Sequence, residues 1–399
     1  MRTMTKHIIN VCLAVCALLA VSCSSNDDTP PGAEESRKTL VLRIGTVGQS
    51  RASAVTIPEK ELMHSLRIII LGRDNRVEHN YHTSFDGMPR ENYIHSILNL
   101  PPGQKTIYLV ANEESVEYID KDGSKKSLTE FLAAIKLGDT DARDKMNGLY
   151  FEPDYTQPIP ISARHDLFIP VGSDKMERDL YMVRVATKFS VTFLNYRDDP
   201  VTIKDFTISS VADQNYLMAR LNEENPMFAG YPSWIEWLKY VSDESQKDPY
   251  NPDLADDYGW VKEYELPASA NKNITYHYNT RNDVSKYISV RQYEAAATPS
   301  WGETKIENIY IPESIKLKAG EQTHGEQEYT MTFDIVNGPN KEVSYTLPNL
   351  KALFRNTHVL VIVQMNRKHT GDDNFLEIRV KTWEQGNKVD NGYWEEVTD

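Results

Sequence analysis

The sequence predicts an all-β fold made of two packed antiparallel sandwiches, on three observations. Apolar and polar residues alternate along most of the apolar segments, which is the period of a half-buried strand. The segments are short and separated by turn residues, and the chain contains 20 prolines and 22 tyrosines. Its 399 residues are enough for two domains, each with its own core. These features favour two β-sandwiches over an α/β fold.

The first residues have the pattern of a secretory signal peptide. Arg2 and Lys6 give a positive start, and the apolar run over residues 8–21 is shorter than the ~20 residues of a transmembrane helix. Cys23 follows small residues, as in a bacterial lipobox, where the cysteine is acylated. The usual leucine three positions earlier is absent, so an ordinary signal with a chance cysteine is the alternative. We expect residues 1–22 to be removed and a lipid on Cys23 to anchor the chain in the outer membrane.

Cysteine usage and charge limit what the mature chain can do. Cys12 and Cys16 leave with the signal, so Cys23 remains alone and no intramolecular disulfide is expected. Residues 23–37 contain few apolar side chains and are interpreted as a lipidated tether. The formal net charge of -14 argues against a nucleic-acid partner, because no basic face is available for phosphates.

An N-terminal sandwich is expected over residues 38–185. Leu40, Leu42 and Ile44 alternate with other residues and predict its first strand. Residues 128–137 carry apolar side chains at helical spacing before Gly138, which predicts a short helical insertion. Two further strands are expected, one at residues 66–71 that ends at turn residues and one at residues 105–112 that follows a turn.

A C-terminal sandwich is expected over residues 186–399. The alternation over residues 181–193 is longer than one ordinary strand, so it predicts two strands that pass from one domain to the other. Residues 226–301 interrupt the strand pattern with an aromatic and acidic insertion. Insertions of this length are often functional. The later strands are expected at residues 201–208, 306–311, 329–336, 358–364 and 375–383.

The insertion offers two candidate ligand sites. Trp234 and Trp237 have a spacing that shares one helical face, and with Trp260 they could stack on a sugar, although such a pair is more often core. A group of oxygen-bearing side chains could hold calcium but lacks the EF-hand order, which favours a solvated loop. These side chains are Asp248, Asn251, Asp253, Asp256 and Asp257.

No catalytic pattern is recognisable in the sequence, so we expect a non-enzymatic protein without a cofactor or metal. A nucleophile elbow, a phosphate-binding glycine loop and a zinc-protease helix motif are all missing. His79 and His82 lie near Asp86, but a strand or turn would not direct the two rings to one side. Surface histidines are the simpler interpretation.

Several pieces follow one another in a characteristic order, namely the lipobox at Cys23 and residues 50–53, 65–70, 102–112, 159–162, 184–188, 310–313, 355–358 and 383–387. In this order they resemble the fimbrillin family of Bacteroidales, lipoprotein precursors of pili, over nearly the whole mature chain. The resemblance implies two transthyretin-like sandwich domains and a structural function at the cell surface, in a fimbrium. It also implies that an arginine-specific protease removes the first strand and that the open groove takes a strand from the next subunit.

The family's processing steps can be carried over to particular residues. Arg51 follows a Gly-Gln-Ser turn and precedes small Ala52, so this bond best matches the cleavage site. Cleavage there would release the strand of Leu40, Leu42 and Ile44 and uncover an apolar edge for another pilus subunit.

The last predicted strand is the candidate donor. Leu376, Ile378 and Val380 alternate with charged residues, so one face could fill a groove while the other stays in water. A permanent edge strand of the second sandwich is the alternative. Two other functions fit the same sequence, namely a pilus anchor or tip subunit, and a monomeric surface lipoprotein that binds carbohydrate.

Overall fold

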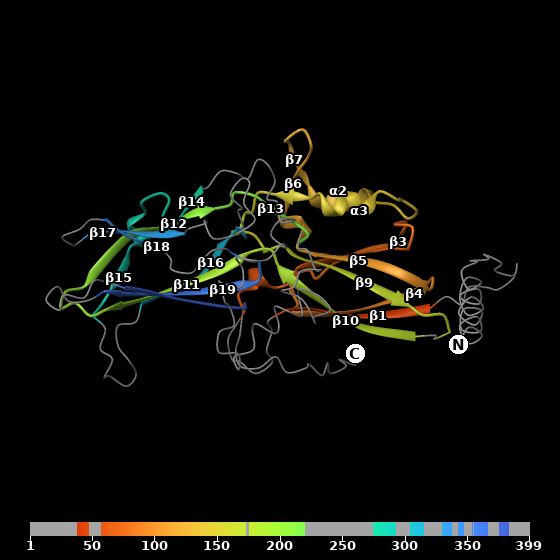
Figure 1. Cartoon of the computed structure of the whole chain (residues 1–399), viewed down its shortest axis with the longest axis horizontal. Helices are drawn as coiled ribbons and strands as arrows, with labels where there is room; N and C mark the ends of the chain where they lie inside the picture. Colours follow the sequence, from red (N-terminus) through yellow and green to blue (C-terminus); the bar gives the residue numbers. More distant parts are fainter. Residues whose placement is uncertain are drawn as a thin grey trace, which may run out of the picture.

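The chain folds into two β-sandwiches that follow one another along the long axis of the molecule (Figure 1). The computed structural model describes residues 38–47, 57–172, 175–219, 274–292, 304–314, 329–336, 342–346, 353, 355–365 and 375–382. Strands dominate these residues and the helices are short, so the all-β prediction is confirmed.

The first sandwich is one sheet that folds over on itself. Its strand order is β3-β2-β5-β9-β10-β1-β4. β9 and β10 pair only at Ser162 with Val183 and at Ile161 with Arg184, so the sheet turns there into a second layer. The bounds are β1 Lys38–Thr46, β2 Ser65–Leu71, β3 Val77–Ser84, β4 Asn92–Leu100, β5 Gly103–Ala111, β9 Ile161–Ile169 and β10 Lys175–Arg184.

A continuous apolar core lies between these two layers. Alternate residues of each strand point inward, which is the period that the sequence showed for the first strand. Leu66, Ile68 and Ile70 of β2 are completely buried in this core. The same cluster contains Ile107 and Leu109 of β5, so β1 and β10 on one side pack against β2 and β5 on the other.

Short elements cover the outer face of β2 and β5 (Figure 1). Ile69 and Tyr108 point into this second core, together with Leu132 of the covering helix. Two strands at the centre of the domain are therefore buried on both faces. The covering elements are η2 Glu113–Ser115, β6 Glu117–Ile119, β7 Lys125–Ser127, α2 Leu128–Ala134, α3 Ala142–Asn147 and β8 Tyr150–Phe151; η1, Glu59–Glu61, lies outside this cover.

The predicted helix over residues 128–137 is shorter than expected. Helix α2 ends at Ala134, and Ile135 already has extended backbone. The amide of Asn80, on the neighbouring β3, donates to the carbonyl oxygens of Leu132 at 2.9 Å and of Ile135 at 2.8 Å. A side chain from another strand thus satisfies the last carbonyl groups, and no further turn is formed.

The second sandwich has two separate sheets around its own core. One has the order β16-β11-β19-β20, and the other has the order β14-β12-β17-β18 with β15 beside β12. The core contains Phe189, Phe206 and Phe333 from three strands. The bounds are β11 Thr187–Asn195, β12 Val201–Val211, β14 Ile274–His277, η7 Val284–Lys286, β15 Ile288–Val290, β16 Thr304–Ile311, β17 Thr330–Ile335, β18 Glu342–Thr346, β19 Thr357–Met365 and β20 Phe375–Thr382.

Both sandwiches use their first strand in the same way. β1 is parallel to β10 and antiparallel to β4, and β11 is parallel to β19 and antiparallel to β16. A parallel partner requires a long crossover, so each first strand pairs with a segment far along the chain. Its pairing closes the sandwich to which it belongs.

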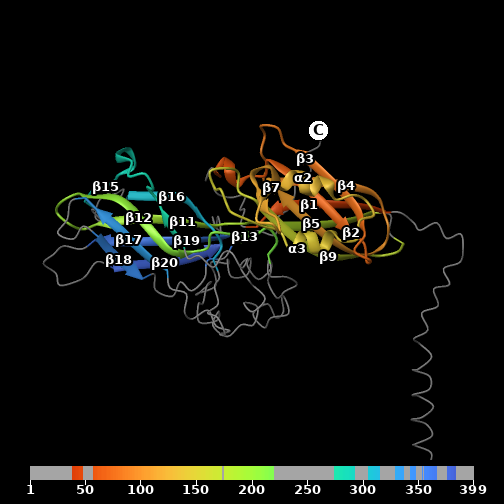
Figure 2. The ribbon, with the colours of Figure 1, turned by 90° about the horizontal axis from the view of Figure 1, so that it is seen from above.

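The chain passes between the sandwiches through a short connection and later returns to the first one. Only Val185 and Ala186 separate β10 from β11, which confirms the prediction of two strands over residues 181–193. After β12 the chain returns, because β13 (Asn215–Tyr216) pairs with β8 of the first sandwich. Figure 2 shows β13 between the two units. Within the described residues, no helix is both long and apolar enough to span a membrane.

Candidate site for strand exchange

The first strand, β1, fills an interior position of its layer. It pairs with β10 from Thr39 to Thr46 and with β4 from Lys38 to Gly45. Both edges of β1 therefore make backbone hydrogen bonds. A strand in this position leaves two unpaired edges behind if it is removed.

The inward side chains of β1 belong to the core of the first sandwich. Leu40 is 1% exposed, and Leu42 and Ile44 are completely buried. Burying three such side chains contributes roughly 5–9 kcal/mol, an upper bound from apolar transfer at about 1.5–3 kcal/mol each. The three residues predicted as the removable strand are thus brought together in one slot between β10 and β4.

The outward face of β1 carries an ion pair to β10. The guanidinium of Arg43 lies 2.5 Å from Glu177 Oε2 and 3.6 Å from Asp179 Oδ1, with about a third of its side chain exposed. Lys175 lies 2.7 Å from Glu177 Oε1 on the other side. The ammonium of Lys175, and then the guanidinium of Arg43, lower the pKa of Glu177. Charge as well as apolar packing fixes the register of β1.

The end of β1 leads directly to the predicted cleavage site. The Val47 amide donates to the Met182 carbonyl oxygen at 2.9 Å, which holds the chain against β10 up to this residue. Arg51 and Ala52 lie outside the described residues, so cleavage at that bond stays a prediction. The chain is described again from residue 57.

The candidate donor strand, β20, lies at the edge of the second sandwich. Its backbone is antiparallel to β19 from Phe375 to Thr382, and it ends the strand order of its sheet. Within the described residues β20 pairs on one side only. The side chains of Leu376, Ile378 and Val380 are outside the described part, so their role as donor residues stays a prediction.

A ring cluster closes the sandwich beside the β1 slot. His79 and Tyr81 of β3 meet Tyr93 and His95 of β4, with ring centroids of Tyr81 and His95 4.2 Å apart. Tyr93 and His95 stand opposite Ile44 and Leu42 of β1 in the strand register. The cluster joins the outermost strands of the two layers.

The two histidines of this cluster are held neutral. The Nε2 atoms of His79 and His95 are buried and have no hydrogen-bond partner among the described residues. Burial, and then the proximity of His95, lowers the pKa of His79 to about 4. Burial also lowers the pKa of His95. A proton on either ring would be a poorly solvated charge next to the core.

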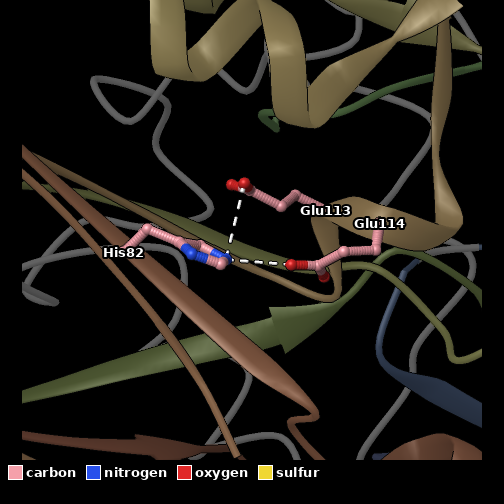
Figure 3. A group of neighbouring side chains, drawn as sticks. All are labelled: His82, Glu113 and Glu114. Carbon is pink, nitrogen blue, oxygen red and sulfur yellow. Dashed lines mark hydrogen bonds and ion pairs between the residues drawn. The ribbon is translucent and has the colours of Figure 1, made fainter.

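A second group of polar side chains has the imidazole and carboxylate groups that commonly bind metal ions. Figure 3 shows His82 of β3 facing two glutamates of η2. His82 Nε2 lies 2.9 Å from Glu114 Oε1 and 3.6 Å from Glu113 Oε1. Arg67 donates to both oxygens of buried Glu113, at 2.6 and 2.7 Å, and Ser65 donates to Glu114. Because Arg67 already neutralises Glu113, we assign this group a structural role that pins η2 to β2 and β3.

The prediction that His79 and His82 do not face one side is confirmed, but the prediction that both are surface histidines is wrong for His79, whose Nε2 is buried. His79 stands opposite Ile70 in the register of β2 and β3, whereas His82 stands opposite Arg67. Residues three apart on a strand point to opposite faces. His79 therefore faces the core, and only His82 reaches the glutamates.

A buried ionic cluster at the junction of the sandwiches escaped the sequence prediction. Lys188 Nζ lies 2.8 Å from Glu61 Oε1, and the Tyr310 hydroxyl donates to the same oxygen at 2.5 Å. Arg355 contacts Glu313 Oε2 at 2.7 Å. All of these residues except Glu61 lie in segments 184–188, 310–313 and 355–358, which were noticed only as family-like pieces. Their spacing along the chain gives no sign that they meet.

Asn356 connects the junction to the end of β1. Its backbone is left-handed, with φ of 58°, and its amide N–H donates to the Ala186 carbonyl oxygen at 2.8 Å. Its side-chain Oδ1 accepts from the Arg184 amide at 3.1 Å, and its Nδ2 lies 3.5 Å from the Val47 carbonyl oxygen. Asn356, the residue just before β19, thus contacts Val47, the residue just after β1.

The remaining predicted site residues lie outside the described residues. They are Cys23, the insertion tryptophans Trp234, Trp237 and Trp260, and the acidic group from Asp248 to Asp257. Lipidation and ligand binding at these positions stay predictions.

Comparison with known proteins finds similarity only at the level of structure. No family model matches the chain, and no curated protein matches its sequence. The fold is similar to the tip fimbrial protein Mfa3 of Porphyromonas gingivalis with C-terminal truncation, at 12% identity and a TM-score of 0.48 over 87% of this chain and 99% of that chain. This protein and the two solved structures described next are fimbrial proteins of Bacteroidales.

Two further solved structures give the same range of similarity. A fimbrilin of Porphyromonas gingivalis is 11% identical with a TM-score of 0.45, over 88% of this chain and 99% of that chain. A fimbrial assembly protein of Parabacteroides distasonis is 9% identical with a TM-score of 0.44, over 87% of this chain and 96% of that chain. At these values the function has to be inferred from the strands of this chain itself.

Proposed function

We propose that this chain is a structural subunit of a cell-surface pilus that polymerises by strand exchange. In this proposal the chain is exported as a lipoprotein through Cys23, and an arginine-specific protease cuts after Arg51. The strand β1 then leaves, and a strand of a second copy takes its place. The proposal rests on the sequence resemblance to fimbrillins and on the position of β1.

The position of β1 is the observation that carries this function. The strand is interior, pairs on both edges and fills the core with three alternate apolar residues, yet it is the first segment of the described chain. A single cut between Val47 and residue 57 would separate it covalently from everything it supports. The open slot would expose two unpaired strand edges and an apolar floor, which an added strand satisfies.

The two other functions differ in which step they lack. An anchor or tip subunit would keep its first strand or accept only one partner. A carbohydrate-binding lipoprotein would stay monomeric and would use aromatic side chains of the insertion. Neither needs β1 to be removable.

Limited proteolysis of the exported chain tests the proposal. We expect trypsin to cut after Arg51 and the product to form ladders that resist SDS on gels without boiling. The new N-terminus is identified by mass spectrometry. Trypsin can also cut after Arg37, ahead of β1, so an Arg51→Gln variant serves as the matched control and should give no ladder.

Two outcomes would contradict the polymerising role. If the chain is cut after Arg51 and remains monomeric, an anchor, tip or carbohydrate-binding function replaces the shaft function. If Arg51 resists both trypsin and an arginine-specific protease, β1 is a permanent strand.

A further inference from the structure

The outermost strands of the first sandwich, β3 and β4, meet across its open side. Each has one strand partner among the described residues, β2 for β3 and β1 for β4. We call the contact between β3 and β4 the seam. Within the described part of the chain, side chains rather than a ladder of backbone hydrogen bonds close this seam.

The connection between β3 and β4 holds one end of the seam in place. The Phe85 amide donates to the His64 carbonyl oxygen at 2.8 Å, and Met63 and Arg90 exchange two backbone hydrogen bonds of 2.9 and 2.8 Å. The rings of Phe85 and Tyr93 follow, with centroids 5.2 Å apart. Because backbone bonds fix this end, β3 and β4 separate most easily from the opposite end.

The two buried histidines close the opposite end of the seam. The ring centroids of His79 and His95 lie 5.7 Å apart. Ile70 of β2 stands opposite His79 in the strand register, and Leu42 of β1 stands opposite His95, so both neighbouring positions are apolar. Neither Nε2 atom has a hydrogen-bond partner among the described residues. The packing of neutral rings therefore holds this end closed.

The titratable groups around the histidines cannot balance a proton on either ring. The hydroxyl oxygens of Tyr81 and Tyr93 lie 3.5 Å apart, and burial, followed by the Tyr81 hydroxyl, raises the pKa of Tyr93 to about 12. This phenol therefore stays neutral in acid. Arg90 adds a positive charge near Tyr93. These groups give an imidazolium no counter-charge, and two imidazolium rings repel each other.

We propose that protonation of His79 and His95 opens the seam from the histidine end, so that β4 moves away from β3 while β2 and β5 stay folded. β4 supplies one of the two hydrogen-bonded edges of β1, and its Tyr93 and His95 stand opposite Ile44 and Leu42. The opening therefore loosens the edge of β1 that faces β4.

The direction of the effect follows from the proton affinity of the two states. In the opened seam water reaches the rings, and His79 titrates near the ordinary histidine pKa of about 6.5. In the closed seam its pKa is about 4. Lowering the pH from 7 to 5 should therefore raise the equilibrium constant for opening roughly ten- to twentyfold from His79 alone. His95, whose pKa is also lowered, acts in the same direction.

Hydrogen exchange of the full uncut chain, measured by mass spectrometry at pH 7 and pH 5, tests the proposal. The rates are corrected for intrinsic exchange at each pH. Peptides of β3 and β4 should then exchange about tenfold faster at pH 5, and peptides of β5 should change by less than about threefold. Strand β5 is the matched comparison because it lies in the same sandwich and is buried on both faces.

Two variants assign the effect to the histidine rings. In a double variant with His79→Phe and His95→Phe, the β3 and β4 peptides should change no more than the β5 peptides. His82→Gln, on the outward face of the same strand, should keep the full response. If the double variant does not fold, the comparison of β4 with β5 in the natural chain still decides. Equal changes in β4 and β5, or an unchanged response of the folded double variant, would overturn the proposal.

Under the proposed function, the same opening should speed the departure of β1. From the chain cut after Arg51, the N-terminal fragment should be released faster at pH 5 than at pH 7, as followed by size-exclusion chromatography. Equal release at both pH values would overturn the link between the seam and β1. If the fragment is released at neither pH, the proposed function fails, whereas exchange of the uncut chain still decides whether acid opens the seam.

Discussion

At the residue scale, the junction of the sandwiches is held by charges that have almost no contact with solvent. Glu61, Arg184, Glu313 and Arg355 are completely buried, and Lys188 is 7% exposed. Charged groups survive in such places only when they are paired and hydrogen-bonded. The pair of Glu61 and Lys188 joins η1 of the first sandwich to β11 of the second, and Arg184 Nε of β10 donates to the Glu61 carbonyl oxygen at 3.2 Å. The pair of Glu313 and Arg355 lies beside them in the second sandwich.

The pair of Glu61 and Lys188 gives a direct test of this arrangement. Glu61→Leu should destabilise the protein by about 3–5 kcal/mol, because the ammonium of Lys188 is left buried without its carboxylate. The double variant Glu61→Leu with Lys188→Met should recover much of this loss. Urea unfolding measures both.

A matched change at the surface provides the control for that experiment. Glu152 pairs with Lys125 in an ion pair that is almost half exposed. Glu152→Leu should change the free energy of unfolding by less than about 1 kcal/mol. An equal effect of Glu61→Leu and Glu152→Leu would contradict the role given to the buried pair.

The histidines of the ring cluster predict a loss of stability in acid. The folded protein binds protons at His79 and His95 less readily than the unfolded chain, because both pKa values are lowered. Their contribution is therefore complete above the ordinary histidine pKa of about 6.5 and decreases as pH falls toward 4. Thermal unfolding between pH 7 and 4 should follow this decrease. In a double variant with His79→Phe and His95→Phe, the decrease in melting temperature between pH 7 and 4 should be smaller. An unchanged decrease would contradict the role given to these two histidines.

At the element scale, β1 fills a slot between β10 and β4 and completes the core of the first sandwich. Its sequence alone forms one apolar face, but only the slot between β10 and β4 gives that face something to bury against. In the proposed function, the same slot would accept another strand with an apolar face of this pattern.

A peptide of β1 should therefore compete with polymerisation. Residues 38–47, added in excess to the chain cut after Arg51, should shorten or abolish the SDS-resistant ladder, because the peptide refills both hydrogen-bonded edges. A Leu42→Asp version should have no effect, since it would bury a carboxylate in the core. Ladders that form equally with both peptides would show that assembly does not use this slot.

At the scale of the whole molecule, the two sandwiches share side chains and backbone. The guanidinium of Arg355 donates to the carbonyl oxygens of Leu217 at 3.0 Å and Tyr216 at 2.8 Å, in the segment that returns to the first sandwich. The Ser162 hydroxyl donates to the same Leu217 oxygen at 2.5 Å. These contacts link Ser162 of the first sandwich, the returning segment at residues 216–217 and Arg355 at the start of β19.

The junction should make unfolding of the two sandwiches cooperative. We expect one calorimetric transition for the natural chain and two separated transitions for Arg355→Gln, because the second sandwich loses its contacts to Leu217 and Tyr216. Arg164→Gln, which removes a half-exposed pair with Asp166, serves as the control and should keep one transition. A single transition in both variants would contradict the coupling.

The sequence could predict strands wherever one face is clearly apolar. The first strand, β2, β5 and β11 were expected within a few residues, because alternation along the chain is a local property. β3, β4 and β9 were not predicted as strands. β3 carries mostly polar side chains, and β4 exposes Ile94 and Leu98 on its outer face, so no simple alternation marks them.

What the sequence by itself determined is therefore the all-β class, the apolar face of β1 and the alternation over residues 376–380. Only the tertiary structure decided that β1 is parallel to β10, that His79 faces the core, and that Glu61 meets Lys188. The physical reason is that periodicity records which side of a segment is buried, whereas the parallel partner of β1 and the ion-pair partner of Glu61 lie more than a hundred positions away in the sequence. A charged residue that is buried in a pair has the same local pattern as one on the surface.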